Sequence, residues 1–203
     1  MRQVHIQGVP VHYDAVGDGF PLLLLPGPTG AWEPTIPLFG ELCRVIAYET
    51  SPLQGTTLEA VPLVEALRQT LGLERLYMAS REESWPLALE FALQYPQRLE
   101  GLILLGIHPV NPDRERHLLT LATRLSTLTT PTLLLSTARV RTTSPVVDIL
   151  CAHLPRYTTQ VLADASASAP PNSLALQAGH ATMAFLLQCE RQRNLVRGAS
   201  FLL

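Results

Sequence analysis

Two short apolar runs constrain the fold of this chain more than any other feature. Residues 20–25 (FPLLLL) and 101–107 (GLILLGI) contain no polar side chain. A strand without a polar face must be covered on both sides, which is typical of parallel sheets with helices on both faces. The two runs therefore predict the central strands of a layered α/β protein.

The rest of the chain predicts alternating strands and helices after an antiparallel start. Residues 4–6 and 11–13 read as a hairpin around Gly8 at a sheet edge. Pro34 and Pro37 restrict any helix in residues 32–42 to its second half, and Pro62 predicts a start delayed by one turn in the helix 57–71. Further strands are expected at 44–47, 75–79, 131–136 and 158–163, and further helices at 83–94, 113–128, 146–153 and 173–193.

We therefore expect residues 1–203 to form one α/β domain with a mostly parallel, twisted sheet of about eight strands and helices on both faces.

Composition excludes several functional classes. Of the 203 residues 47% are hydrophobic and 16% charged, which favours a large folded core over disorder. A net charge of −2 gives no basic surface for phosphates, so nucleic acid is not an expected partner. No segment reaches the roughly 18 apolar residues of a membrane span, and the first residues lack a signal-peptide core. We expect a cytoplasmic protein without a membrane partner.

The cysteines and histidines predict no metal site. Cys43, Cys151 and Cys189 are odd in number and far apart, and they fit no CxxC spacing. This pattern is typical of buried thiols in a reducing compartment. The histidines do not have the spacing of metal ligands. We expect neither a metal nor another cofactor.

Several phrases of the chain resemble the α/β-hydrolase family. They are GVPVHYDAVGDGFPLLLLPG, CRVIAYE, GLERLYMAS and LALEFALQYPQRLEGLILLG, and the match covers nearly the whole chain. The order of strand, elbow helix, Tyr-Pro and buried strand is typical of the family, so the resemblance implies the α/β-hydrolase fold. Only 23 residues separate Ile107 from Pro131, where larger members carry a lid. The resemblance thus implies a lid that is absent or reduced to one helix, 113–128.

The nucleophile position departs from the family pattern. The family uses a nucleophile on a tight elbow, a His, an acid that orients the His, and two N–H groups for the oxyanion. Aligned on the flanking phrases, the nucleophile falls on Glu82 and the two elbow glycines on Ser80 and Ser84. Serine is small enough to keep the turn. A carboxylate is a nucleophile in the dehalogenase and epoxide-hydrolase branches, although Glu is one methylene longer than their Asp.

Other interpretations of the elbow remain open. Arg81, Glu82 and Glu83 also read as a charged helix start, where carboxylates favour the positive end of the helix dipole. Ser80 or Ser84 is a candidate for a displaced nucleophile, or for a hydroxyl that caps the helix.

The acid and His positions also differ from the pattern. After the strand 131–136 no carboxylate occurs before Asp148, and no His follows the final strand. His180, in Ala178-Gly179-His180, mimics the family phrase but is expected inside the last helix. His108 and Asp113 are fallback candidates for base and acid, because they follow a strand at the edge where open α/β sheets bind ligands. The alternative for each is an ordinary surface residue.

The resemblance implies that Gly27 and Pro28 are a remnant of the oxyanion loop. Pro26 occupies the place of a His that often precedes this glycine, and it offers no donor. Residues 28–32 can still expose N–H groups at a helix start.

Three functional hypotheses follow. The first is a pseudo-hydrolase with a degenerate catalytic triad that binds a small apolar ligand or a protein partner. The second is an active esterase-like hydrolase with a rearranged site. The residues of such a rearranged site would be Ser80, Glu82, Ser84, His108, Asp113 and His180. The third is an interface: apolar strand ends and the tail 201–203 predict an exposed patch and a homodimer.

Overall fold

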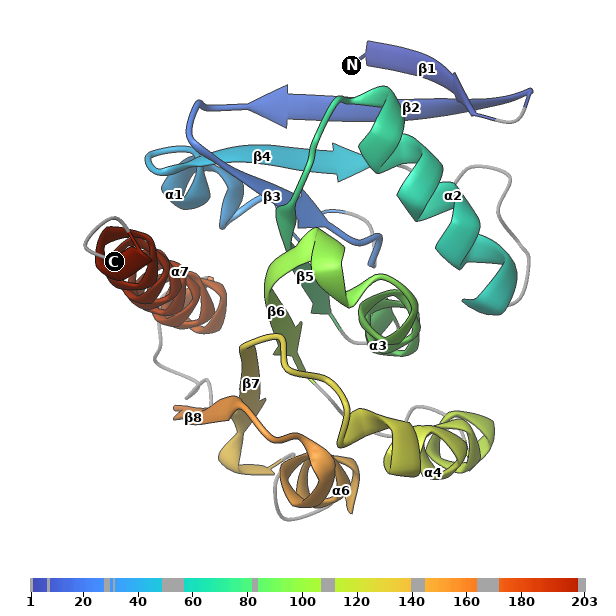
Figure 1. Ribbon diagram of the computed structural model, residues 1–203, viewed down its shortest axis with the longest axis vertical. Helices are drawn as coiled ribbons and strands as arrows, with labels where there is room; N and C mark the ends of the chain where they lie inside the picture. Colours follow the sequence, from blue (N-terminus) through green and yellow to red (C-terminus); the bar gives the residue numbers. More distant parts are fainter. Residues whose placement is uncertain are drawn as a thin grey trace.

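The protein is an eight-stranded, mostly parallel sheet between two layers of helices (Figure 1). The computed structural model describes residues 2–6, 8–27, 30, 32–48, 57–81, 84–106, 112–139, 145–163 and 172–200. Strand order is β1-β2-β4-β3-β5-β6-β7-β8. β1 (Arg2–Ile6) and β2 (Val9–Val16) form the predicted antiparallel hairpin at one edge, and β2 pairs antiparallel with β4 (Cys43–Tyr48). β4 in turn runs parallel to the remaining strands, which are β3 (Phe20–Leu24), β5 (Leu76–Arg81), β6 (Leu99–Leu105), β7 (Thr132–Thr137) and β8 (Tyr157–Leu162).

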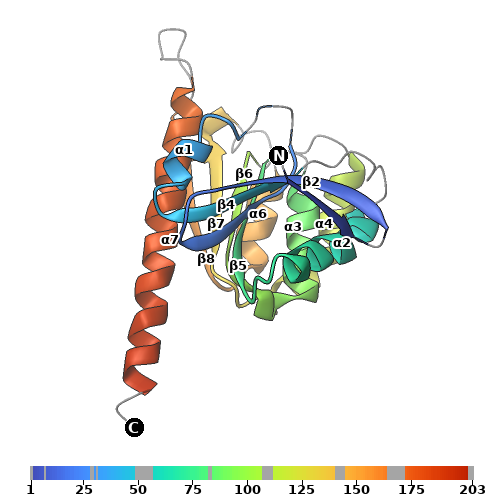
Figure 2. The ribbon, with the colours of Figure 1, turned by 90° about the horizontal axis from the view of Figure 1, so that it is seen from above.

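Helices lie on both faces of the sheet, as the apolar strands require (Figure 2). One face carries α2 (Thr57–Thr70), α3 (Trp85–Gln94), α4 (Pro112–Leu125) and α6 (Pro145–His153). The other carries α1 (Ile36–Phe39) and the long α7 (Ser173–Ser200), which extends past the body of the protein (Figure 2). The short 3-10 helix η2 (Pro96–Arg98) follows Tyr95 and ends α3 where the Tyr-Pro pair predicts.

Alternate side chains of each central strand enter two separate cores. Successive strand residues point to opposite faces, so an uninterrupted apolar run supplies both cores. Leu23, Met78, Leu104 and Leu134 are buried beneath α2, α3, α4 and α6. Leu22, Tyr77, Ile103 and Leu135 are buried against α1 and α7.

Two helix boundaries differ from the sequence prediction. α2 begins at Thr57, and Pro62 lies inside it, so the predicted delay was wrong. Pro62 is exposed and close to the helix start, where the helix loses only the one backbone bond that this residue would donate. α7 continues from Arg193 to Ser200.

The connection between β6 and β7 contains α4 as a packed crossover helix. Its side chains Leu118, Leu121 and Leu125 are buried in the same core as α3 and α6. This agrees with a lid reduced to one helix. No helix in the described part of the chain is both long and apolar enough to cross a bilayer.

A buried ion pair joins the end of α2 to the start of β5. Arg68 donates to both oxygens of Glu65 at 2.7 Å, and its Nη1 also donates to the carbonyl of Leu73. Both side chains are buried. The hydrogen bonds from Arg68 lower the pKa of the Glu65 carboxyl below its ordinary value.

We predict that Glu65→Gln lowers the free energy of unfolding by about 2 kcal/mol at pH 7, because charge-assisted bonds are lost. A carboxyl with a lowered pKa stabilises the fold above its ordinary pKa, and this contribution is lost as the pH falls through the lowered value. The difference in free energy of unfolding between the unmodified protein and Glu65→Gln should therefore narrow below pH 4.5, the ordinary pKa of the carboxyl. Urea unfolding at several pH values measures this difference, with Glu41→Gln at an exposed position as the control. An equal loss at every pH would contradict this assignment.

Candidate functional site

A tight strand-to-helix corner lies at the carboxyl end of central strand β5, where the resemblance implies the elbow. β5 ends at Arg81 and α3 begins at Trp85, so the chain passes from strand to helix over a short connection. Ser84 Oγ donates to the carbonyl of Arg81 at 3.0 Å and accepts from its N–H at 3.3 Å. Glu82, the expected nucleophile position, lies outside the described residues, so its role stays a prediction.

The two serines that flank this corner bond to the backbone. Ser80 is fully buried and, by alternation with Met78, faces the core under α3; its Oγ lies 3.5 Å from the carbonyl oxygen of Ile103. Ser84 occupies the N-cap position of α3, but its hydroxyl makes no capping bond to the helix, because it is bonded to Arg81 instead. The capping interpretation of Ser84 was therefore wrong. Among the described residues, neither hydroxyl has an imidazole as a hydrogen-bond partner.

His180 lies inside α7, as its position in the sequence predicts, and its side chain is exposed. The preceding Gly179 serves helix packing, because a Cβ there would lie 2.7 Å from Leu38 Cδ2 of α1. The glycine that makes Ala178-Gly179-His180 resemble the catalytic His phrase is therefore explained by the close packing of α7 on α1. Nothing in this arrangement brings the imidazole to the elbow.

The other candidate residues are only partly described. His108 and Pro28 lie outside the described residues. Asp113 belongs to the first turn of α4, and its side chain is not described. Gly27 is exposed just beyond β3.

The oxyanion-loop region folds back on itself. The N–H of Glu33 donates to the carbonyl of Gly30 at 3.2 Å, and the N–H of Ile36 donates to that of Trp32 at 3.0 Å. Trp32 Nε1 donates to the carbonyl of Leu25 at 2.8 Å, which ties the loop to the end of β3. These described donors are used inside the loop.

A pocket of about 190 Å³ opens at the carboxyl ends of β5 to β8, beside the first turns of α7. Sequence reasoning did not find it, because its walls come from four strands and a distant helix. Its walls are mainly apolar: Leu105, Leu135, Leu162, Leu174, Ala175 and Ala178, with Gly106 and the polar residues Arg81, Ser136 and Thr137. We call this the carboxyl-edge pocket.

Arg81 is the charged side chain among the described residues that line the carboxyl-edge pocket. Its guanidinium carbon lies 5.4 Å from the ring centroid of Trp32, a cation–π contact. Alternation along β5 places Arg81 with Tyr77 and Ala79 on the α7 face. That alternation is the signal that could have identified Arg81 from the sequence.

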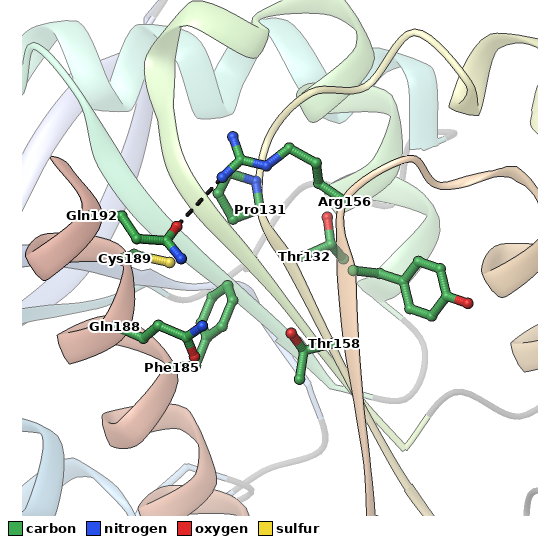
Figure 3. A pocket seen from close by; sticks show the side chains of 9 residues that line it. Pro131, Thr132, Arg156, Thr158, Phe185, Gln188, Cys189 and Gln192 are labelled. Carbon is green, nitrogen blue, oxygen red and sulfur yellow. Dashed lines mark hydrogen bonds between the residues drawn. The ribbon is translucent and has the colours of Figure 1, made fainter. Parts of the chain in front are cut away.

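A second pocket, of about 180 Å³, lies at the opposite edge, between the start of β7 and β8 and the middle of α7 (Figure 3). Arg156 reaches toward Gln192, with 3.5 Å between Nη2 and Oε1 (Figure 3). Burial raises the pKa of the adjacent Cys189 thiol to about 11, so the thiol is protonated and a poor nucleophile at neutral pH. Ligands of open α/β sheets bind at the carboxyl ends of the strands, which makes the carboxyl-edge pocket the better candidate site.

Within the described ranges, no three His, Cys, Asp or Glu side chains are grouped as metal ligands would be.

Comparisons with solved structures define the class of fold. A thermophilic esterase from Thermogutta terrifontis, with malate bound, is 18% identical with a TM-score of 0.73 over 93% of this chain and 99% of that one. A membrane phospholipase A described as a bacterial virulence factor is 16% identical, with a TM-score of 0.74 over 93% and 86%. An α/β-hydrolase enzyme, MGS-M2, from a Medee basin deep-sea metagenome library is 13% identical, with a TM-score of 0.75 over 91% and 97%.

The chain therefore has the α/β-hydrolase fold. No protein-family model and no curated protein sequence matches it.

Proposed function

We propose that this chain is an α/β-hydrolase-like protein without hydrolytic activity, which binds a small, mainly apolar ligand in the carboxyl-edge pocket. One observation carries the proposal. Of the described residues that line this pocket, none is a His, Asp or Glu, and most are apolar. Binding sites for small molecules have this character, whereas hydrolysis by the usual route needs a base oriented by an acid.

The chemistry of the other nucleophile candidates supports the same conclusion. Ser80 and Ser84 bond to backbone carbonyls. Burial raises the pKa of the Cys43 thiol to about 11, as it does for Cys189. Catalysis depends on the joint geometry of nucleophile, base and acid, and the described side chains do not assemble such a group. The free, buried thiols of Cys43 and Cys189 also support a cytoplasmic location.

The alternative is an active esterase-like hydrolase with a rearranged site, since the end of β5 and the start of α3 lie only four residues apart, at Arg81 and Trp85. We expect purified protein to give no hydrolysis of p-nitrophenyl acetate or butyrate above the level of a Ser80→Ala/Ser84→Ala double variant. We also expect no labelling by a fluorophosphonate probe, because among the described residues the hydroxyls of Ser80 and Ser84 are bonded to backbone carbonyls and not to a base. Turnover that disappears in Glu82→Gln, Ser84→Ala or His108→Ala would establish the active alternative.

Binding in the carboxyl-edge pocket can be tested with a pocket-filling variant. Ala175 lines the pocket, whereas its neighbour Leu176 is 42% exposed on the outside of α7. We predict that Ala175→Phe weakens binding of the neutral probe hexanamide by about tenfold or more, because the ring occupies the cavity. Leu176→Phe, the matched control, should bind as the unmodified protein does. Isothermal titration calorimetry measures both, and equal affinities in the two variants would place the ligand elsewhere.

We also propose that the protein is a homodimer joined through edge strand β8. Five residues of β8, Tyr157 to Val161, are exposed, and β8 is the last strand in the sheet order. It carries no charged residue or proline, which usually protect an exposed edge. Antiparallel pairing of two copies about Thr159 would place Tyr157 opposite Val161, a favourable aromatic and β-branched pair. The tail 201–203 lies outside the described residues.

The dimer predicts a mass of twice 22.3 kDa in light scattering at tens of micromolar protein. Thr159→Lys should give the monomer mass, because pairing about Thr159 would place the two ammonium groups directly opposite each other at the two-fold axis. Leu187→Lys, an exposed position on α7, should leave the dimer intact. A monomeric unmodified protein would disprove the interface.

A further inference from the structure

We propose that the carboxyl-edge pocket selects a small monocarboxylate with an apolar chain, and that Arg81 binds its carboxylate. This inference rests on the proposed function, since it names the ligand class for that pocket. Arg81 is the one charged side chain among the described lining residues. A pocket with apolar walls and a single guanidinium is complementary to an amphipathic anion.

The position of Arg81 is fixed at both ends of its side chain. Its backbone is held by the parallel register with Leu105 of β6 and by the hydroxyl of Ser84. Its guanidinium lies over the ring of Trp32. Trp32 is itself 7% exposed and hydrogen-bonded through Nε1 to the end of β3. A charge held in this way loses little conformational entropy when a ligand binds.

The guanidinium of Arg81 is suited to a carboxylate. Its carbon lies 5.4 Å from the ring centroid of Trp32, and its N–H donors lie in the plane of the guanidinium. Five donors in a planar fork can serve a carboxylate in addition to other acceptors. The hydroxyls of Ser136 and Thr137, also in the lining, add polar character beside the strand ends.

The size and charge of the pocket restrict the ligand further. About 190 Å³ is less than the roughly 300 Å³ of the smallest pockets for drug-sized molecules, so a short chain fits best. The walls formed by Leu105, Leu135, Leu162 and Leu174 match a hydrocarbon chain. The planar fork of Arg81 matches the two oxygens of a carboxylate, and Arg81 is the one cation among the described lining residues, so the proposed charged group is a carboxylate and not a doubly charged phosphate ester.

The experiment compares hexanoate with its neutral isostere hexanamide in calorimetric titrations at pH 7. The unmodified protein should bind hexanoate about tenfold or more tightly than hexanamide, and hexyl phosphate no more tightly than hexanoate. Arg81→Gln should bind hexanoate and hexanamide equally and keep its affinity for hexanamide. Arg191→Gln, an exposed site on α7, makes the same change in net charge and should leave the preference intact.

The outcomes separate this inference from the proposed function. If hexanamide and hexanoate bind equally to the unmodified protein, or if Arg81→Gln keeps the preference, the role of Arg81 is disproved while the pocket stands. If neither probe binds, or if Ala175→Phe leaves both affinities unchanged, the proposed function fails as well. Tighter binding of hexyl phosphate would overturn the carboxylate assignment. Arg81→Lys retains the charge and the fold, and it should show an intermediate preference, because the bidentate geometry is lost.

Discussion

The architecture depends on central strands that bury side chains on both faces. Because β3, β5, β6 and β7 are largely buried on both faces, each side of the sheet needs a helical layer. Four helices share one side, whereas α7 and the short α1 cover the other. Polar contacts hold α7 in place: Tyr77 donates to Glu190 at 2.7 Å, and Arg193 donates to Glu100 at 3.1 Å. Burial raises the pKa of Tyr77, so its phenol remains a donor.

The candidate site lies at the start of α7, where this helix first packs against the sheet. The first turns of this helix close one side of the carboxyl-edge pocket, and four strand ends close the other. The position is the one where open α/β sheets bind ligands, yet its described lining offers hydrophobic contact and one cation. Proteins of this fold with esterase or phospholipase names share the frame. Function has to be argued from the side chains at the site, because one fold supports many activities.

The fold was largely predictable from the sequence, because it follows from local patterns. Apolar runs, the hairpin around Gly8 and the Tyr-Pro end of α3 each determine a nearby element. Features that depend on distant residues were not predictable. The contact between Trp32 and Arg81 joins a turn to the end of β5, far apart in the chain, and the exposure of β8 depends on which elements lie beside it. Pro62 misled because a helix tolerates proline near its start when the ring faces solvent.

The close packing of α1 on α7 links the shape of the carboxyl-edge pocket to the position of Trp32. A Cβ at position 179 would lie 2.7 Å from Leu38 Cδ2, so a larger residue than Gly179 would force Leu38 of α1 to move, and the N–H of Ile36 in that helix donates to the carbonyl of Trp32. Ala178, the residue before Gly179 in α7, lines the pocket. In a related protein whose pocket is enlarged at this turn of α7, we therefore expect the Trp32 ring beside the Arg81 guanidinium to shift as well. The length of the ligand's apolar chain and the preference for its charged group are then expected to change together.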